Sequence, residues 1–230
     1  MPRALHKMRS YEDLKKINED FFLTNPMSMC YSNPNRLIRA IENKRKDVIV
    51  REVDRLQGKR LLDVGCEAGH ILLSLDKRKR DVLVGLDIAE NALEKAKSLA
   101  NDRKYEFRLG DARSMKFENT IFDIVLCCHM LEHVNEPELV AKEIRRVLKA
   151  SGRSVIGIPN DVFVLRAKNL LKWLGFDLGG LSKSLAPGHV TVYDLRRIRK
   201  LLNEYFVIEK ICKSPSRFFV FDYVCVCRPR

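Results

Sequence analysis

Short runs of β-branched and aliphatic residues alternate with helical runs between Arg60 and Pro159. The predicted strands are LLDV, DVLVGLD, YEFRLGD, FDIVLCC and RSVIGIP, with helices expected near 70–76, in NALEKAKSLAND and in ELVAKEIRRVLKASG. Strands separated by helices of this length imply right-handed βαβ crossovers and a parallel sheet covered on both faces. The alternation therefore predicts a doubly wound α/β fold.

Helices are expected before this core. Ser10 can cap a helix that runs to about Phe22, with Asp13 in the N3 position of a capping box. After a proline-containing loop, Asn35 can cap a longer helix that runs through Asp54. We interpret residues 1–58 as an N-terminal helical cover.

The C-terminal region adds two β-rich runs, FVIEKIC and FFVFDYVCVC, after a helix in YDLRRIRKLLNEY. The short turn KSPSR between them predicts an antiparallel hairpin that closes one sheet edge. We therefore expect a mostly parallel, seven-stranded sheet within residues 59–230. A helical segment and a Gly-rich loop, residues 161–190, would form a substrate-cover insertion.

The turn in LLDVGCEAGH follows the first predicted strand and is expected to face a ligand, because open α/β sheets bind ligands beyond the carboxyl ends of their strands. A dinucleotide fingerprint requires G-x-G-x-x-G, and Glu67 stands where its second glycine belongs. Asp63 and Glu67 would also repel a pyrophosphate. A ligand with an ammonium and a sulfonium group would instead be attracted by Asp63, while loop N–H groups hold its carboxylate.

That ligand is S-adenosylmethionine (SAM), and residues 60–160 resemble the class I SAM-dependent methyltransferases, specifically the methyltransferase type 11 group with the ubiquinone-biosynthesis O-methyltransferases. Four stretches match in order: LLDVGCEAG, VGLDIAENALEKAK, LGDARSMKF and FDIVLCCHMLEHVNEP. Glu67 departs from the usual middle glycine. The resemblance implies SAM as cofactor and methyl transfer as the activity.

The resemblance also implies a set of cofactor-binding residues: Asp63, Gly65, Cys66, Glu67, Gly69, Asp87, Ile88, Asp111, Ala112 and Cys128. Asp87 would accept both ribose hydroxyls, since it ends a strand about twenty residues past the turn. The alternative role of Asp87 is to cap the helix that follows, but Glu90 and Asn91 are better placed for that role. Ile88 would lie against adenine, Asp111 and the Ala112 N–H would bind its edge, and Cys128 would close the methionine end. A plain turn role for Asp111 is the rival interpretation.

The stretch HMLEH, His129 to His133, fits the H-x-x-E-H pattern of some zinc proteases and also the LEHV turn of the methyltransferase group. Protease ligation needs one continuous helix, but a strand precedes the stretch and Pro137 would begin the next helix. Some relatives hold a divalent ion in this turn, and His129 replaces their first acid. We predict no metal site.

An oxygen nucleophile needs its proton removed, and His133 and His189 are the candidate bases because imidazole titrates near neutral pH. His189 precedes a predicted helix at the expected rim of the site. For each, the alternative is a structural histidine bonded to a backbone carbonyl.

Composition limits the partners, the state of the cysteines and the location that we expect. Lys and Arg outnumber Asp and Glu by 43 to 30, which favours anionic partners, but the basic runs lie on predicted helices where charge usually marks a solvated face. Seven cysteines without CxxC pairs, no signal peptide and no long apolar run lead us to expect reduced thiols and a cytoplasmic protein.

We predict an enzyme that methylates a small molecule, most plausibly at oxygen. The alternatives are a non-catalytic SAM-binding protein and a nucleic-acid methyltransferase; CCHM in place of N-P-P-[YF] argues against the latter. The helix expected in 162–176 has one apolar and one basic face and carries Trp173. It is favoured as an internal cover, with peripheral binding to anionic membrane as the alternative. The sequence does not indicate an oligomeric state.

Overall fold

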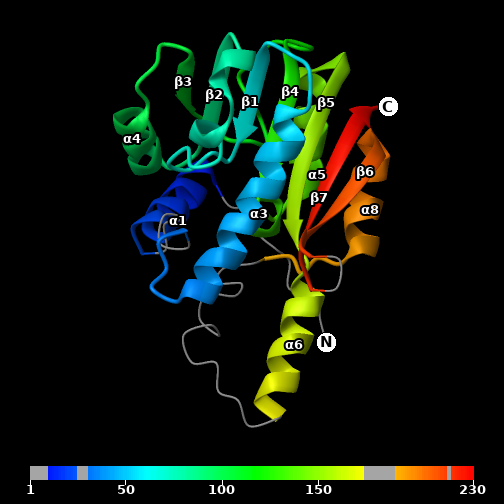
Figure 1. Ribbon diagram of the computed structural model, residues 1–230. Helices are drawn as coiled ribbons and strands as arrows, with labels where there is room; N and C mark the ends of the chain where they lie inside the picture. The colour runs from blue at the N-terminus through cyan, green and yellow to red at the C-terminus, as the bar shows by residue number, and fades with distance from the viewer. Residues whose placement is uncertain (1–9, 25–30, 174–189, 217–218) are drawn as a thin grey trace.

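The sheet has seven strands in the order β3-β2-β1-β4-β5-β7-β6 (Figure 1). The computed structural model describes residues 10–24, 31–173, 190–216 and 219–230. The strands are β1 (Arg60–Val64), β2 (Val82–Asp87), β3 (Tyr105–Leu109), β4 (Phe122–Cys128), β5 (Leu148–Pro159), β6 (Phe206–Pro215) and β7 (Val220–Pro229). Strands β1 to β5 pair in parallel, while β7 is antiparallel to both β5 and β6. The predicted doubly wound fold and its C-terminal hairpin are confirmed.

The direction of the strand order reverses between β1 and β4. The chain runs from β1 outward to β2 and β3, and then returns to place β4 on the other side of β1. Such a switch point leaves an opening at the carboxyl ends of the two central strands, because the following connections diverge to opposite sides. The glycine turn after β1 and the HMLEH turn after β4 therefore meet at one edge of the sheet.

Helices cover both faces of this sheet. They are α1 (Tyr11–Thr24), α3 (Arg36–Asp54), α4 (Glu90–Leu99), α5 (Pro137–Val147), α6 (Asp161–Trp173) and α8 (Leu195–Tyr205), with short 3₁₀ turns η1 (Leu72–Ser74), η2 (Lys77–Lys79) and η3 (Leu131–His133). Buried residues of α3 pack with one face of the central strands, and buried residues of α5 and α8 pack with the other. In Figure 1, α3 crosses in front of the sheet and α5 lies behind it.

The predicted helix starts are confirmed by their capping bonds. Ser10 Oγ accepts the Asp13 N–H at 3.1 Å, and the Asp13 carboxylate accepts the Ser10 N–H at 3.2 Å, which is a capping box. The Asn35 side chain accepts the N–H groups of Leu37 and Ile38 at the start of α3. These bonds satisfy amides that have no partner within the helix.

Three local expectations differ from the structure. The helix expected near 70–76 is only the 3₁₀ turn η1. Its first residue, Leu72, and the residue that follows it, Leu75, are both buried, at the three-residue spacing of that geometry. The helix expected to extend through Gly152 ends at Val147, because Leu148 already pairs with Phe122 of β4. Helix α4 has Ala89 as its N-cap residue, so neither Glu90 nor Asn91 caps it.

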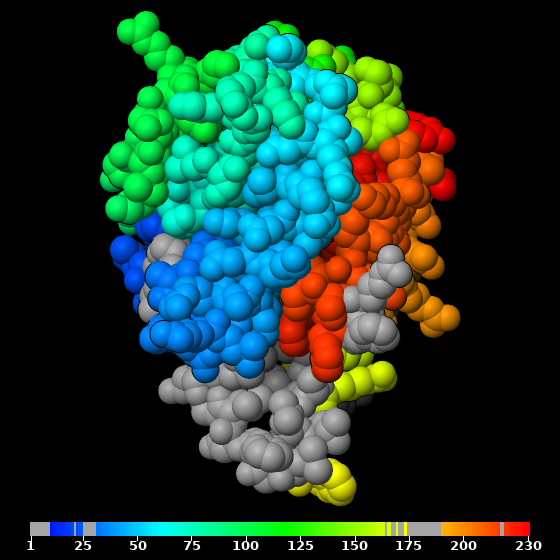
Figure 2. Space-filling model, viewed as in Figure 1, coloured from blue at the N-terminus to red at the C-terminus, as the bar shows by residue number. Residues whose placement is uncertain are grey.

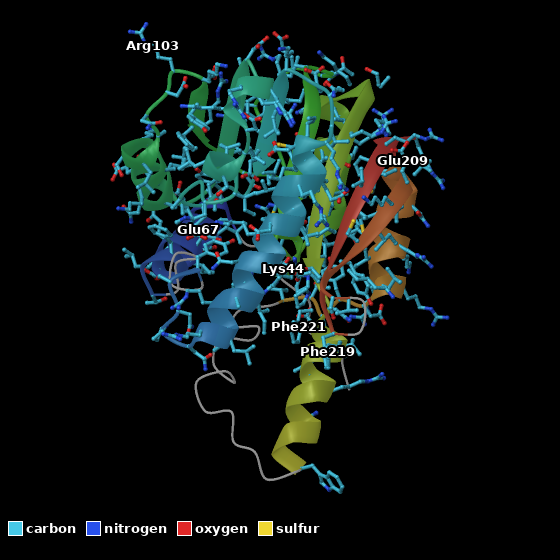
Figure 3. All side chains as sticks on the ribbon, in the orientation of Figure 1. Lys44, Glu67, Arg103, Glu209, Phe219 and Phe221 are labelled. Atoms are coloured by element: carbon cyan, nitrogen blue, oxygen red, sulfur yellow. The ribbon has the colours of Figure 1, made fainter. Side chains whose placement is uncertain are left out.

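Helix α6 follows β5 and extends away from the sheet (Figure 1). Its first turn is fixed to the hairpin by an edge-to-face contact between Phe163 and Phe221, with ring centroids 5.7 Å apart. Figure 3 shows Phe221 and Phe219 near this junction. The Gly-rich loop expected after α6 lies outside the described residues. Among the described helices, none combines the length and apolarity needed to span a membrane.

Candidate active site

The turn after β1 has three residues in left-handed backbone conformations. Gly65 and Gly69 both have φ of 76°, and Glu67 has φ of 48°. The turn is held to β2 because the N–H groups of Gly65 and Cys66 donate to the Leu86 carbonyl at 2.8 and 3.1 Å. A non-glycine residue in this conformation is uncommon. Glu67, which stands where the resemblance expects a glycine, thus adopts a backbone conformation that favours glycine.

Two acids, the buried Asp63 and the half-buried Asp87, lie next to the turn. Asp63 is only 3% exposed and lies on the same face of β1 as Leu61, which faces α3. Burial and, secondarily, the nearby Asp87 carboxylate raise the pKa of Asp63 to about 8. Burial likewise raises the pKa of Asp87. A cationic ligand would relieve this unfavourable placement of two carboxyl groups in a dry site.

The Asp87 carboxylate also organises the site directly. Its Oδ2 accepts the Glu67 N–H at 2.8 Å, and its Oδ1 accepts the Ala89 N–H at 2.9 Å. Each carboxylate oxygen can accept a further hydrogen bond, so these contacts leave capacity for ligand hydroxyls. The same side chain therefore joins the glycine turn to the end of β2.

A pocket opens at the carboxyl ends of β1 to β4. It is lined by Leu14, Asn18, Gly65, Leu86, Asp87, Ile88, Gly110, Asp111, Ala112, Arg113, Met130, His133 and Val134. Six of the residues predicted from the sequence are in this lining: Gly65, Asp87, Ile88, Asp111, Ala112 and His133. Residues from four separate strand ends thus converge where the resemblance places the cofactor.

The other predicted residues do not line this pocket. Asp63 is buried below the turn, and Cys66 packs against β2, where a Cβ on Gly85 would lie 2.7 Å from its Sγ. Cys128 packs similarly against Gly157 of β5, and burial raises the pKa values of both thiols well above the usual range. Glu67 and Gly69 belong to the turn itself. His189 lies outside the described residues.

The pocket has contributors that sequence reasoning missed. Leu14 and Asn18 come from α1, and Met130 follows β4. A Cβ on Gly65 would lie only 2.6 Å from the Met130 Cγ, so the glycine is needed for the two turns to meet. The capping residues predicted the helix α1, but they could not show which strand ends that helix approaches.

Asp111 is bonded as a turn residue and also lines the pocket. Its Oδ1 accepts the Arg113 N–H at 2.8 Å, and its carboxylate pairs with the Arg113 guanidinium at 2.7 Å, which is the bonding of a turn residue. Burial alone would raise the pKa of Asp111, but the bonds to Arg113 outweigh it and lower the pKa. Arg113 also binds Glu136 at 2.6 Å and lines the pocket beside Asp111.

The HMLEH stretch forms a tight turn rather than a continuous helix. It contains the end of β4 followed by the 3₁₀ turn η3, and His129 has a left-handed φ of 55°. His133 lines the pocket on the side of Asp111 and Ala112. Among the described residues, no group of three or more His, Cys, Asp and Glu side chains could hold a metal ion.

Comparisons with known proteins identify relatives of this chain. Residues 62–156 match the family model described as a methyltransferase domain. A demethylmenaquinone methyltransferase from Lactococcus lactis is 30% identical over 71% of this chain and 71% of its own length. The chain belongs to the methyltransferase family. A ubiquinone biosynthesis O-methyltransferase from Pelagibacter ubique is 29% identical over 69% of each chain, and other proteins of that name are matched over 48% to 61% of their length.

Solved structures of methyltransferases share the fold. A magnesium protoporphyrin IX methyltransferase from Synechocystis, with bound SAH, superimposes with a TM-score of 0.69 over 94% of this chain and 99% of that chain, at 19% identity. The present chain is a SAM-dependent methyltransferase, as the resemblance implied. Its own residues fit that ligand, since the buried Asp63 suits a cationic group and Asp87 lines the pocket with capacity for ligand hydroxyls.

Proposed function

We propose that this methyltransferase transfers the methyl group of SAM to a small molecule, at an oxygen atom. The observation that carries the proposal is the pocket at the carboxyl ends of β1 to β4, where residues from all four strand ends converge, with Asp87 in the lining and Asp63 buried below the glycine turn. The similarity to O-methyltransferases supports oxygen as the acceptor atom. SAM, when bound, supplies an electrophilic methyl group, so the chain mainly has to align the acceptor and exclude water.

Named residues would divide the work of holding SAM. Asp87 would accept the ribose hydroxyls, Ile88 would contact adenine, and Asp111 with the Ala112 N–H would bind the adenine edge. Asp63 would attract the ammonium group, with Cys66 and Cys128 shaping the methionine end. Residues 1–58 and 161–190 would cover the acceptor, a role that the lining contributions of Leu14 and Asn18 support.

The decisive experiment is a search for the acceptor. The protein is incubated with SAM and metabolite extracts, and mass spectrometry detects compounds that gain one methyl group. We expect a small hydroxyl compound to gain the group, with SAH as co-product. Calorimetry with SAM and SAH runs alongside, and tight SAM binding without any methylated product would favour a non-catalytic SAM-binding protein.

Asp63 gives a test of the cofactor assignment through its pKa of about 8. At pH 7 most of the free protein carries a protonated Asp63, and a bound ammonium favours the ionised form, so binding should release a proton. We expect calorimetry in buffers of different ionisation enthalpy to show release of about one proton per SAM. Asp63→Asn should abolish the release. Asp81→Asn, at an acid whose side chain is 65% exposed, is the control and should leave it unchanged.

The end of helix α6 supports a further proposal, peripheral binding to anionic membrane. Trp173 is 80% exposed, and Leu165 and Phe219 are also exposed. An interfacial aromatic residue near lysines is typical of segments that dock on anionic lipid. Since Trp173 is the only tryptophan, we expect its fluorescence to shift to the blue with phosphatidylserine vesicles at low salt, and less in a Lys168→Glu, Lys172→Glu variant. An unshifted spectrum with excess vesicles would assign α6 to an internal cover.

A further inference from the structure

A buried group of charged side chains lies where β4, β7, α3 and η3 meet, next to the cofactor pocket but outside its lining. At its centre is His129, with a side chain only 13% exposed. Its Nε2 lies 3.6 Å from Asp222 of β7, its Nδ1 lies 3.7 Å from Glu132 of η3, and the same Nδ1 lies 3.4 Å from the Arg45 guanidinium of α3. We refer to these four residues as the His129 cluster.

The position of His129 is fixed from several directions. It directly follows β4, and its N–H donates to the Gly157 carbonyl of β5 at 3.0 Å. Its φ of 55° is rare for a residue with a side chain, and such conformations persist where the surroundings enforce them, often at functional sites. The next residue, Met130, lines the cofactor pocket and approaches Gly65. His129 is therefore adjacent to the pocket, at the switch point of the sheet.

The cluster also has unused hydrogen-bonding capacity. Glu132 is 1% exposed, and its Oε2 has no hydrogen-bond partner among the described residues. A buried carboxylate oxygen without a donor is costly. The Arg45 guanidinium is occupied by Asp222 and by Glu42, which it binds at 2.7 Å. A protonated His129 would supply a donor to the Glu132 carboxylate.

The contact with Arg45 identifies the atom of His129 that can take up a proton. Arginine remains protonated and only donates, so its contact at 3.4 Å suits the tautomer of His129 with the lone pair on Nδ1. The contact is long for a hydrogen bond, so this lone pair stays available to a closer donor. In the neutral ring the hydrogen then sits on Nε2, which faces Asp222. A proton added at Nδ1 would face Glu132. Each ring nitrogen thus has a carboxylate beside it when protonated.

We propose that His129, oriented by Asp222, accepts the proton of the acceptor hydroxyl. This inference rests on the proposed oxygen methylation. The O–H bond of the acceptor breaks and its proton passes to Nδ1 of His129. The oxygen keeps the electron pair and bonds to the methyl carbon, and the pair of the broken C–S bond stays on sulfur. His133, which lines the cofactor pocket, then has a binding role instead of a role as base.

The charges around His129 set the direction of its pH dependence. Burial alone would lower the pKa of His129, but the carboxylates of Asp222 and Glu132 outweigh it and the opposing Arg45, so the pKa is raised. A base works only when neutral, so its function should appear as pH rises through this raised pKa. Asp222→Asn removes a negative charge and should move that transition to lower pH.

The first test needs no acceptor. Imidazole proton NMR titrations are recorded for the wild type in complex with SAH and for His129→Gln, His133→Gln and Asp222→Asn. We expect the signal missing from His129→Gln to titrate with a pKa above 6.5 in the wild type and at lower pH in Asp222→Asn. A signal with a pKa below 6.5, or one that Asp222→Asn leaves in place, would overturn the proposed pairing.

The second test uses 4-nitrophenol, a hydroxyl compound whose ionised form has a distinct absorption band. Added to the SAH complex below its own pKa, it should become more ionised with the wild type and with His133→Gln, and stay as in buffer with His129→Gln. His133→Gln should instead change SAH affinity. Equal ionisation with His129→Gln, or no ionisation with the wild type, would refute His129 as base. SAM binding, measured by calorimetry, tests the proposed function separately. A failure of the proposed function can therefore be distinguished from a failure of His129 as base.

Discussion

Replacing Gly65 by alanine is expected to destabilise the protein and weaken SAM binding much more than the same replacement at Gly69. The two glycines have the same φ of 76°, so an added Cβ meets about the same backbone strain at both, of about 1–2 kcal/mol. At Gly65 the new Cβ would also lie 2.6 Å from Cγ and 3.0 Å from Cβ of Met130, whereas at Gly69 its nearest neighbours are 3.4 Å away. Overpacking of this kind adds about 1–3 kcal/mol.

Chemical denaturation and calorimetry would measure the two effects. We expect Gly65→Ala to lose about 2–5 kcal/mol of unfolding free energy, and Gly69→Ala only the strain component. A double variant, Gly65→Ala with Met130→Ala, should recover part of the loss because the colliding side chain is removed. If the two single variants were equally stable and bound SAM equally well, the contact between the glycine turn and Met130 would have no role in the site.

Arg45→Met is the second replacement with a large expected effect. The guanidinium pairs with both carboxylate oxygens of Asp222, whose side chain is 1% exposed, and this pairing outweighs burial in raising the pKa of Arg45. Removing one partner of a buried pair leaves an uncompensated charge, which costs about 3–5 kcal/mol. Thermal and urea unfolding should show this loss.

Arg55→Met is the matched control for this experiment. It makes the same change next to the C-terminal end of α3, at a side chain that pairs with Glu52 at 3.0 Å but is 60% exposed. Glu52 is buried, but Lys210 and Arg51 still pair with its carboxylate when Arg55 is replaced. The loss of the exposed Arg55 should therefore cost only about 0–1 kcal/mol, and the control should stay close to the wild type. Adding Asp222→Asn to Arg45→Met should restore part of the stability. Equal losses in the two single variants would show that burial of the Asp222 pair does not govern its contribution.

The glycine turn and the strand pattern could be predicted from the sequence because both depend on neighbouring residues. The capping box at Ser10 and the hairpin after α8 are equally local, and they too were predicted. The short 3₁₀ turn at Leu72 was not, since two buried positions three residues apart fit one turn of either helix type. Local patterns specify elements better than they specify the ends of those elements.

The His129 cluster could not be predicted in this way. Arg45 and Asp222 are 177 residues apart, and only the strand order brings α3 next to β7. Asp222 reads as one polar residue in an apolar strand, and HMLEH directed attention to metal ligation and to His133. Similarly, Arg113 is a close neighbour of Asp111 in the sequence, but its other partner, Glu136, is 23 residues away from it. Pairings between distant elements require the fold.

The packing of α3 has a consequence for the order in which the chain can fold. Val48, Ile49 and Val53 of α3 pack with Val224 and Val226 of β7, and Figure 2 shows atoms of α3 beside those of the hairpin on one face. During synthesis α3 emerges well before β7. Its inner face and Arg45 therefore lack these partners until the hairpin has been made, and a ribosome-bound chain stalled before β6 should expose α3 to proteases that the finished protein resists.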